Sequence, residues 1–487
     1  MSNSVVALTV IFAIIIFGSI IGFYAGVRHK MNLEQWTVGG RGFGLMLIWL
    51  LMAGEVYTTF SFLGASGWAY SRGGPTLYII AYLTLGRAVY FHVQPYIWEV
   101  GRKFKMQTQP DFFERRYGSK YLAAFVAVVG FVFLIPYLQL QLTGLGIIVG
   151  MASFEGISRP VAMIIAFALV AGFVFSSGVR GVAWVSILKD ALMLFVVFFI
   201  GFGLPYIYFH GIGPMFAEII KAKPTHLVLP GATKNMGHAW YVSTVFMASL
   251  GGLMWPNLFA TSFAAKNAST LRRSAVVMTT YNVILPLIFF VGFTALLAVP
   301  GLKNGDLALL ALVRKTYPAW LLGVIGGTGA LTAMVPAAYY ILTAATLFAK
   351  NFYRPMFAPS MSDDQVAKLA KRMVLVVTGV ALYFAIYSST TLVYLLLIGF
   401  AGVSQFFPGV VLGLWWRRIT MPGAFIGIVV GVATASFLML TKRDPFMGIN
   451  AGFFALCLNF LITVGVSSIT RFQPSGFRES SEASAAG

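Results

Sequence analysis

Long apolar segments alternate with short polar ones along the whole chain. Each apolar segment reaches the roughly 20 residues that a helix needs to cross the hydrocarbon core of a bilayer. The segments are continuously apolar and lack the residue-by-residue alternation of a membrane-barrel strand. The pattern therefore predicts an all-α polytopic membrane protein with about 13 transmembrane helices. The predicted spans are 5–27, 45–70, 75–99, 121–151, 158–177, 182–210, 239–265, 274–299, 317–350, 373–390, 392–416, 421–441 and 446–470.

Composition agrees with this prediction and excludes a soluble enzyme with a single anchor. Of 487 residues, 59% are hydrophobic and 10% are charged, whereas soluble domains carry about 25% charged residues. The sequence shows no cluster with the spacing of metal ligands and no arrangement typical of a catalytic site. We therefore expect neither an enzyme nor a cofactor.

The net charge of +20 predicts how the chain crosses the membrane. If the N-terminus lies outside, the inward loops hold about twice as many Lys and Arg residues as the outward loops. This asymmetry predicts a multi-pass protein of the bacterial cytoplasmic (inner) membrane, with its N-terminus outside and its C-terminus inside. Loop charges of this kind do not require a nucleic-acid partner. The expected partners are the lipid bilayer and a small solute, and no obligate protein partner is predicted.

The span at 45–70 carries a carboxylate, Glu55, near its middle, beside Gly54, Thr58 and Thr59. An acid at membrane depth costs about 2.5–3.5 kcal/mol on insertion scales, so a retained one is expected to have a function. Spans interrupted by glycine are also places where transporters unwind a helix around a solute. The sequence therefore predicts the transport helix of a secondary transporter here.

The span at 239–265 is interrupted by a Gly-Gly pair and by Pro256. Proline removes a backbone donor and clashes with the carbonyl four residues earlier, so we expect the helix to open between Trp255 and Asn257. An ordinary kink in a packed helix is the alternative. Because this span comes five spans after the first interrupted one, the chain fits a five-plus-five inverted repeat with the solute at the two breaks.

Three further polar side chains in spans are candidates for the solute site. Arg87 either meets an anionic solute, pairs with Glu55 or Glu99, or extends to the membrane interface. Gln139 and Gln141 either bind the solute or join two helices. Since they are two residues apart on a helix, at most one of them is expected to line a site.

Lys189 and Asp190 lie within the predicted span 182–210. Adjacent residues on a helix point in different directions, so we expect one to face a cavity while the other finds a separate partner. The alternative is that the span starts later and both lie at the interface. In the ninth span, glycines near Gly326 and a proline at Pro336 predict a kinked or partly unwound helix.

With these residues in hand, the chain resembles the sodium/solute symporter family, and more narrowly its bacterial monocarboxylate permease (MctP-type) branch. The resemblance covers nearly the whole chain and implies a five-plus-five (LeuT-type) core. It rests on WTVGGRGFG (36–44), AGEVYTTFS (53–61), IPYLQLQLTGLG (135–146), ILKDALM (187–193) and ALTAMVPAAYYILTAATLFAKNFYR (330–354).

The resemblance also implies where a coupling sodium ion would lie. Two of its carbonyl ligands would come from Gly54 and Tyr57, and a third from about Thr332. The two hydroxyl ligands of the family would fall on Val335 and Pro336, which have no side-chain oxygen. A hard cation prefers oxygen ligands, so this sodium site is expected to be degenerate. Some sodium-independent transporters of this fold place a basic side chain there, and Lys189 lies on the corresponding helix.

These observations lead to one main hypothesis and two alternatives. The main hypothesis is a proton-coupled symporter that takes up lactate, pyruvate, acetate, propionate or a related short acid by alternating access. The first alternative keeps the fold but couples another solute, such as an amino acid or vitamin acid, to sodium. The second is a passive channel or a membrane sensor module. The candidate solute-binding residues are Gly54, Thr58, Thr59, Arg87, Gln139, Gln141, Trp255, Pro256 and Asn257, and the candidate ion-coupling residues are Tyr57, Glu55, Lys189, Asp190 and Thr332.

The predicted domain organisation follows from the two repeats. It comprises a first helix and cytoplasmic loop (1–44), the first repeat (45–210), an extracytoplasmic loop (211–238), the second repeat (239–416), two C-terminal helices (417–470) and a disordered cytoplasmic tail (471–487).

Overall fold

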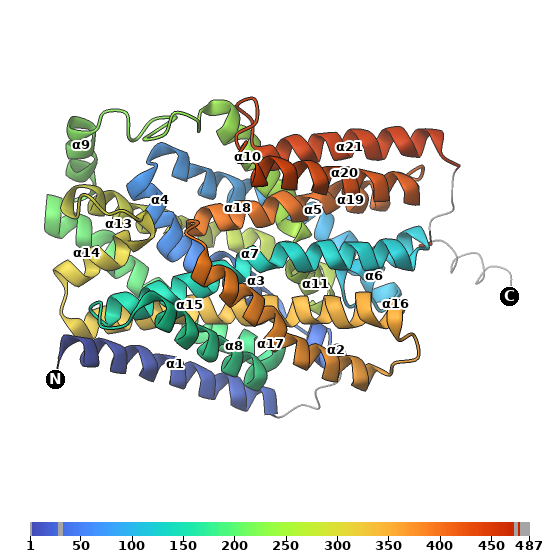
Figure 1. Ribbon diagram of the computed structural model, residues 1–487, viewed down its shortest axis with the longest axis horizontal. Helices are drawn as coiled ribbons and strands as arrows, with labels where there is room; N and C mark the ends of the chain where they lie inside the picture. Colours follow the sequence, from blue (N-terminus) through green and yellow to red (C-terminus); the bar gives the residue numbers. More distant parts are fainter. Residues whose placement is uncertain (1, 28–32, 472–475, 478–487) are drawn as a thin grey trace.

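The computed structural model describes residues 2–27, 33–471 and 476–477, and the regular structure in these ranges is helical. Most helices run along the long axis of the molecule and pack into one bundle (Figure 1). Helix α1 begins at one end of the bundle and α21 ends at the other (Figure 1). We call these ends the N-terminal side and the C-terminal side. Which side faces the cell interior stays a prediction, as does the division into repeats.

Within the described ranges, ten helical segments are long and apolar enough to cross a membrane, and two bent helix pairs bring the number to twelve. A shorter apolar segment, Arg159–Phe175, corresponds to the remaining predicted span. The spanning helices are α1 (Asn3–Val27), α5 (Tyr78–Lys103), α7 (Lys120–Ala152), α8 (Arg159–Phe209), α12 (Ala268–Tyr281) with α13 (Leu285–Ala298), α15 (Ala319–Thr346), α17 (Asp363–Tyr387), α18 (Leu392–Val403) with α19 (Phe407–Trp415), α20 (Met421–Leu440) and α21 (Ala451–Ile469).

Shorter helices lie between these spans. They are α2 (Leu33–Val38), α6 (Gln109–Tyr117), α9 (Ile212–Ala222), α14 (Ala308–Thr316), α16 (Arg354–Phe357), the one-turn segments η2 (Gly74–Leu77), η4 (Asn282–Ile284), η5 (Gly305–Leu307) and η7 (Ser404–Phe406), and the widened turn η6 (Leu347–Tyr353). The all-helical fold class is confirmed.

Helix α8 contains two predicted spans in one continuous helical element of 51 residues. Both ends of α8 lie beside α14. Glu155, just before α8, forms an ion pair with Arg314 (3.4 Å between Oε1 and Nη1). Tyr208, near the end of α8, hydrogen-bonds Thr316 through its hydroxyl (3.0 Å). A straight helix of this length would separate its ends by about 76 Å. The element therefore doubles back, and its two halves are the two predicted spans.

The first interrupted span consists of α3 (Leu45–Val56), η1 (Phe60–Gly64) and α4 (Ala65–Ser71), and it bends by 46°. Tyr57 leaves the helical conformation (φ −91°, ψ 80°). The amide of Thr58 donates to Ser61 Oγ (3.0 Å), and the amide of Phe60 donates to Thr58 Oγ1 (3.1 Å). These hydroxyls replace the carbonyl acceptors that the break removes, so the interrupted backbone stays hydrogen-bonded inside the protein.

The second interrupted span consists of α10 (His238–Gly251), η3 (Gly252–Met254) and α11 (Pro256–Ala264), and it bends by 49°. Trp255 at the bend has an extended ψ of 125°. The ring of Pro256 disfavours the helical conformation of the residue before it, which explains this backbone angle. The prediction that the helix opens beside Pro256 is confirmed.

The ninth predicted span is not unwound at its glycines, because α15 is a continuous helix. Its glycines permit close packing instead of unwinding. A Cβ added at Gly327 would lie 2.6 Å from Ile14 Cδ1, and one added at Gly326 would lie 2.9 Å from Ile11 Cδ1. Helix α1 therefore packs directly against the backbone of α15. Pro336 still has a local effect, since it has no N–H to donate to the carbonyl of Thr332 four residues earlier.

Candidate solute and coupling site

A cavity of about 50 Å³ lies between the two helix breaks. Its walls come from both interrupted spans and from α5, α7, α15 and α18. Six separate segments therefore surround one small volume at the centre of the bundle. The polar side chains in its lining are Glu55, Tyr82, Arg87, Tyr90, Tyr137, Ser249 and Tyr340.

Glu55 joins the two helix breaks directly. It lies in the last turn of α3, and its Oε2 accepts a hydrogen bond from Asn257 Nδ2 (2.8 Å) in the first turn of α11. The sequence separates these residues by about 200 positions, yet both were candidates because each lies beside a break. The amide holds the carboxylate at the cavity wall, as a buried polar group requires a hydrogen-bond partner.

Aromatic rings form one wall of the cavity. Tyr137 and Tyr340 are stacked with their centroids 4.0 Å apart. Trp255 meets Tyr137 edge-on at 5.3 Å and Phe400 at 5.4 Å. A Cβ at Gly399 would clash with the Trp255 ring, so only glycine leaves room for the indole in this position. The interlocked rings therefore give the cavity a rigid, largely apolar wall.

Arg87 is the basic side chain of the cavity lining. Only 6% of the residue is exposed, and its guanidinium lies 4.9 Å from the centroid of the Tyr90 ring. Within the described ranges its Nε has no hydrogen-bond partner, and no ion pair joins it to Glu55 or Glu99. An anionic partner stabilises a buried guanidinium, so the Arg87 guanidinium is suited to bind a carboxylate ligand. Extension to the membrane interface does not occur.

The ammonium of Lys189 lies behind the first helix break. Lys189 is fully buried, and its Nζ donates to the carbonyl of Tyr57 (3.2 Å). A Cβ built on Gly54 would lie 3.8 Å from this Nζ and 3.9 Å from Val335 Cγ1. Two of the residues expected around a sodium ion, Gly54 and Tyr57, thus lie against a lysine ammonium. Asp190 forms an ion pair with it (2.8 Å), so the expectation that these neighbours find separate partners is wrong. The long lysine side chain reaches back to the adjacent carboxylate.

Five other candidates support the site without lining the cavity, whereas Gln139 lies elsewhere. Thr59 Oγ1 donates to Gln141 Oε1 (2.7 Å), which ties the first break to α7. Thr58 accepts backbone and tyrosine contacts at the same break. Gln139 points elsewhere, since its amide donates to the carbonyl of Phe384 on α17 (3.3 Å) and it lines a separate peripheral groove. The structure therefore does not bring Gln139 to the solute cavity. Gly54 and Pro256 shape the two breaks.

Several lining residues had not been singled out from the sequence. Tyr82 and Tyr90 lie eight positions apart on α5 and face the cavity with Arg87. The repeat of polar aromatic residues at about four-residue spacing was a visible signal for that helix face. Ser249 and Tyr340 gave no comparable signal, because a single hydroxyl in an apolar span has many neutral explanations.

An aromatic layer separates the cavity from the N-terminal side. Tyr82 contacts Phe400 (5.5 Å between centroids) and stacks on Tyr78 (5.7 Å). Tyr78 in turn contacts Trp240, which lies 6.2 Å from Trp68. A hollow of about 520 Å³ lies beyond this layer, lined by Trp68, Trp240 and loop residues. The cavity is therefore closed on this side by rings that must move before a solute can enter.

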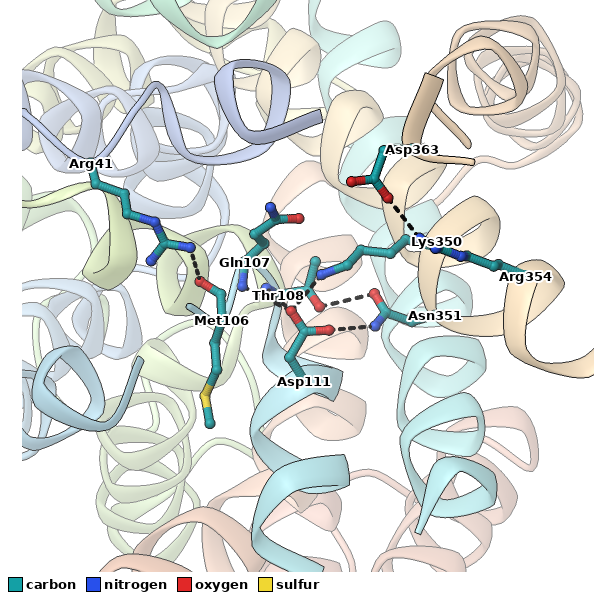
Figure 2. Close-up of polar contacts among 9 residues, drawn as sticks. All are labelled: Arg41, Met106, Gln107, Thr108, Asp111, Lys350, Asn351, Arg354 and Asp363. Atoms are coloured by element: carbon teal, nitrogen blue, oxygen red, sulfur yellow. Dashed lines mark hydrogen bonds and ion pairs between the residues drawn. The ribbon is translucent and has the colours of Figure 1, made fainter. Parts of the chain in front are cut away.

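A polar cluster closes the C-terminal side, and Figure 2 shows its contacts. Asp111 on α6 accepts hydrogen bonds from Lys350 Nζ (2.6 Å) and Asn351 Nδ2 (2.8 Å), and Thr108 donates to Asn351 Oδ1 (2.9 Å). Burial raises the pKa of Asp111, but the charge of Lys350 and these hydrogen bonds outweigh burial and hold the pKa below its usual value. We call these four residues the latch. It joins α6 to η6, the widened turn that follows α15, while the carboxylate is ionised.

The chain is similar in sequence to several known proteins. Residues 36–431 match the Sodium:solute symporter family. The chain is 41% identical over 478 residues to the uncharacterized symporter YhjB of Bacillus subtilis (strain 168), covering 96% of this chain and 97% of that protein. It is 27% identical over 482 residues to a monocarboxylate transport permease protein of Rhizobium johnstonii, covering 95% and 96%.

Solved structures share the fold at low sequence identity. A Na⁺-coupled sialic acid symporter in a substrate-bound outward-open state matches with a TM-score of 0.78 at 17% identity, covering 96% of this chain and 98% of that one. Mhp1, a nucleobase-cation-symport-1 family transporter, matches with a TM-score of 0.58 at 14% identity, covering 92% and 97%. These likenesses establish a LeuT-type fold for the chain.

Proposed function

The chain belongs to the sodium:solute symporter family, and on that premise we propose that it takes up short monocarboxylates by alternating access and couples their uptake to protons. Family membership makes it a multi-pass secondary transporter and not an enzyme. The solute, the coupling ion and the orientation in a bacterial inner membrane are the proposed parts.

The placement of Lys189 is the observation on which proton coupling depends most. Its ammonium occupies the space beside the Tyr57 carbonyl where the family resemblance implies sodium, and Val335 supplies no hydroxyl there. Lys189 and Asp190 are both buried and carry opposite charges 2.8 Å apart, which makes the pair a candidate for the proton-exchanging group. In this proposal, protonation of the pair Lys189–Asp190 or of Glu55 favours one facing state, and deprotonation releases it.

A short monocarboxylate fits the features of the central cavity. Arg87 offers a buried guanidinium for a carboxylate, and the aromatic wall of Trp255, Tyr137 and Tyr340 offers an apolar surface for a short carbon chain. The cavity of about 50 Å³ favours a small solute. The 27% identity to a monocarboxylate transport permease points to the same class. Arg87 would bind the carboxylate. Glu55 and Asn257, which join the two helix breaks, would contact the rest of the solute.

Two alternatives make different demands on the same site. A sodium-coupled transporter of another solute would need oxygen ligands around the ion, which Glu55 and the freed backbone carbonyls could provide if Lys189 moved away. A passive channel would need a continuous path, whereas the aromatic layer and the latch close both sides in this conformation. A sensor would bind the solute without accumulating it.

Uptake by purified protein in proteoliposomes tests the proposal. We expect an inward proton gradient to drive accumulation of labelled lactate equally well in sodium and in choline. Lys189→Met should abolish accumulation but retain counterflow exchange, and Arg87→Gln should raise the half-saturating lactate concentration about tenfold or more. Gln139→Ala is the matched control, since Gln139 faces away from the cavity. Loss of accumulation in choline would favour sodium coupling, and normal proton-driven accumulation by both Lys189→Met and Glu55→Gln would exclude these residues as proton carriers.

A further inference from the structure

A large groove lies on the C-terminal side beside the latch. It has a volume of about 1090 Å³ and is lined by the α5–α6 connection, α6, the start of α7 and Lys350. Basic side chains from Lys105, Arg115 and Lys120 line it alongside Asp111 and Glu114. The solute cavity is separate, since the two share no lining residue.

The chain itself returns to this groove after its last helix. Gly476 lines the groove, and its amide donates to the carbonyl of Arg116 on α6 (3.4 Å). A Cβ at this position would clash with the carbonyl of Arg115, so a glycine is required for the close approach. The ring of Phe477 stacks on Phe104 (5.9 Å between centroids, 24° between planes) and meets Phe112 edge-on (5.4 Å).

Helix α6 is the element on which several contacts of the C-terminal side converge. The latch joins it to η6, which follows α15. Gln109 at its start donates to the carbonyl of Met254 (3.0 Å), which lies in the second helix break. Just before α6, the carbonyl of Met106 accepts a hydrogen bond from Arg41 (2.8 Å), as Figure 2 shows. A segment that holds α6 in place therefore stabilises the closed C-terminal side and the second break together.

We propose that this groove is the docking site of the chain's own C-terminal segment, anchored by Phe477, and that the docked segment slows opening of the C-terminal side. The seated Gly476 and Phe477 identify the occupant. The basic lining also suits the sequence that follows, in which Glu479 and Glu482 accompany Arg478. This inference needs a transporter that alternates between facing states, but it depends neither on the solute nor on the coupling ion.

The first test measures opening by cysteine labelling, which requires no solute. Cys457 is the one native cysteine, so Cys457→Ser gives a background without cysteine. Ala260→Cys then reports access, because Ala260 lines a small hollow between the second break and the latch. In detergent, we expect Phe477→Ala to speed labelling by a charged methanethiosulfonate about three- to tenfold, because it removes the aromatic contacts of Phe477 with Phe104 and Phe112.

Two controls decide whether the docked ring is responsible. Phe477→Trp should keep labelling slow, since it retains an aromatic ring for Phe104 and Phe112. Phe357→Ala is the matched control, because Phe357 is 66% exposed on the same side and its ring contacts Phe352 and Tyr353 within its own segment. Unchanged labelling in Phe477→Ala, or equal acceleration by Phe357→Ala, would overturn the proposal. Lactate uptake can fail in the test of the proposed function without affecting this result.

A second test keeps the proposal falsifiable if Phe477→Ala folds poorly. The chain is truncated after Arg471, which leaves every spanning helix intact. A fluorescent peptide of residues 472–487 is then titrated onto it and followed by anisotropy. We expect saturable binding that is lost when the peptide carries Phe477→Ala or the protein carries Phe104→Ala. Absence of binding by the native peptide would overturn docking, and equal binding by both peptides would overturn the role of Phe477.

Discussion

Removal of the Lys189 charge should expose how strongly the buried pair stabilises the fold. The side chain of Lys189 is fully buried and that of Asp190 is 3% exposed, with 2.8 Å between Nζ and Oδ1. Lys189→Met keeps the length of the side chain but removes the charge. It leaves the Asp190 carboxylate without its counter-charge and the Tyr57 carbonyl without this donor.

The size of the effect follows from the geometry. Removing one partner of a buried ion pair typically costs about 3–5 kcal/mol, because the other charge stays buried without compensation. Neutralising both partners avoids that penalty. We therefore expect Lys189→Met to lose about 3–5 kcal/mol of stability and Lys189→Met/Asp190→Asn to recover more than half of this loss.

The assay is thermal unfolding in detergent for the wild type, both single variants and the double variant. The four midpoints form a double-mutant cycle, which isolates the coupling between Lys189 and Asp190. Gln139→Ala is the control for a polar change within a span that leaves the site intact. If the double variant is destabilised by the sum of the two single effects, the residues are not coupled and the argument from a buried pair fails.

Three further predictions concern other parts of the molecule. Asp111→Asn should weaken the latch and speed labelling of Ala260→Cys at neutral pH. Since the pKa of Asp111 is held below its usual value, its stabilising contribution is present at neutral pH and is lost only as the pH falls below about 4 and through the folded pKa. The difference between wild type and variant should therefore persist at about pH 5 and shrink only below about pH 4, and a difference already lost at about pH 5 would contradict this. Burial raises the pKa of Asp306, outside the spans, to about 7 against one hydrogen bond from the Leu392 amide, so the folded state loses stability as the pH rises from about 4 to about 7. Asp306→Asn should therefore stabilise the protein by about 2–3 kcal/mol more at pH 8 than at pH 5 in thermal unfolding, and an equal effect at both values would exclude this carboxylate as the titrating group. Gly399→Ala should displace Trp255 from the cavity wall, which lowers transport and also costs about 1–3 kcal/mol of stability through overpacking. Uptake and thermal unfolding on the same sample measure the two effects, and unchanged transport would contradict the role of this wall.

Some features of the site were predictable because they depend on local chemistry. Proline at 256 opens a helix wherever it lies in mid-span, and an acid such as Glu55 is too costly in a bilayer to lack a partner. Other features were not predictable because the same residue type has two physical uses. The glycines near Gly327 could unwind α15 or admit a neighbouring helix, and the structure shows that α1 packs against them. The side chains of Lys189 and Asp190 were expected to point in different directions from the helix. The long, flexible lysine side chain instead bends back and pairs with Asp190.

The sequence by itself determined the fold class and the two helix breaks. These follow from short-range properties, namely the thickness of the bilayer, the apolar length of each segment and the backbone limits of glycine and proline. Only the tertiary structure decided which polar groups meet. The contact between Glu55 and Asn257 and the contact between Lys189 and the Tyr57 carbonyl depend on how each helix is rotated and tilted against its neighbours. That rotation is set by packing across the whole bundle, so no single stretch of sequence records it.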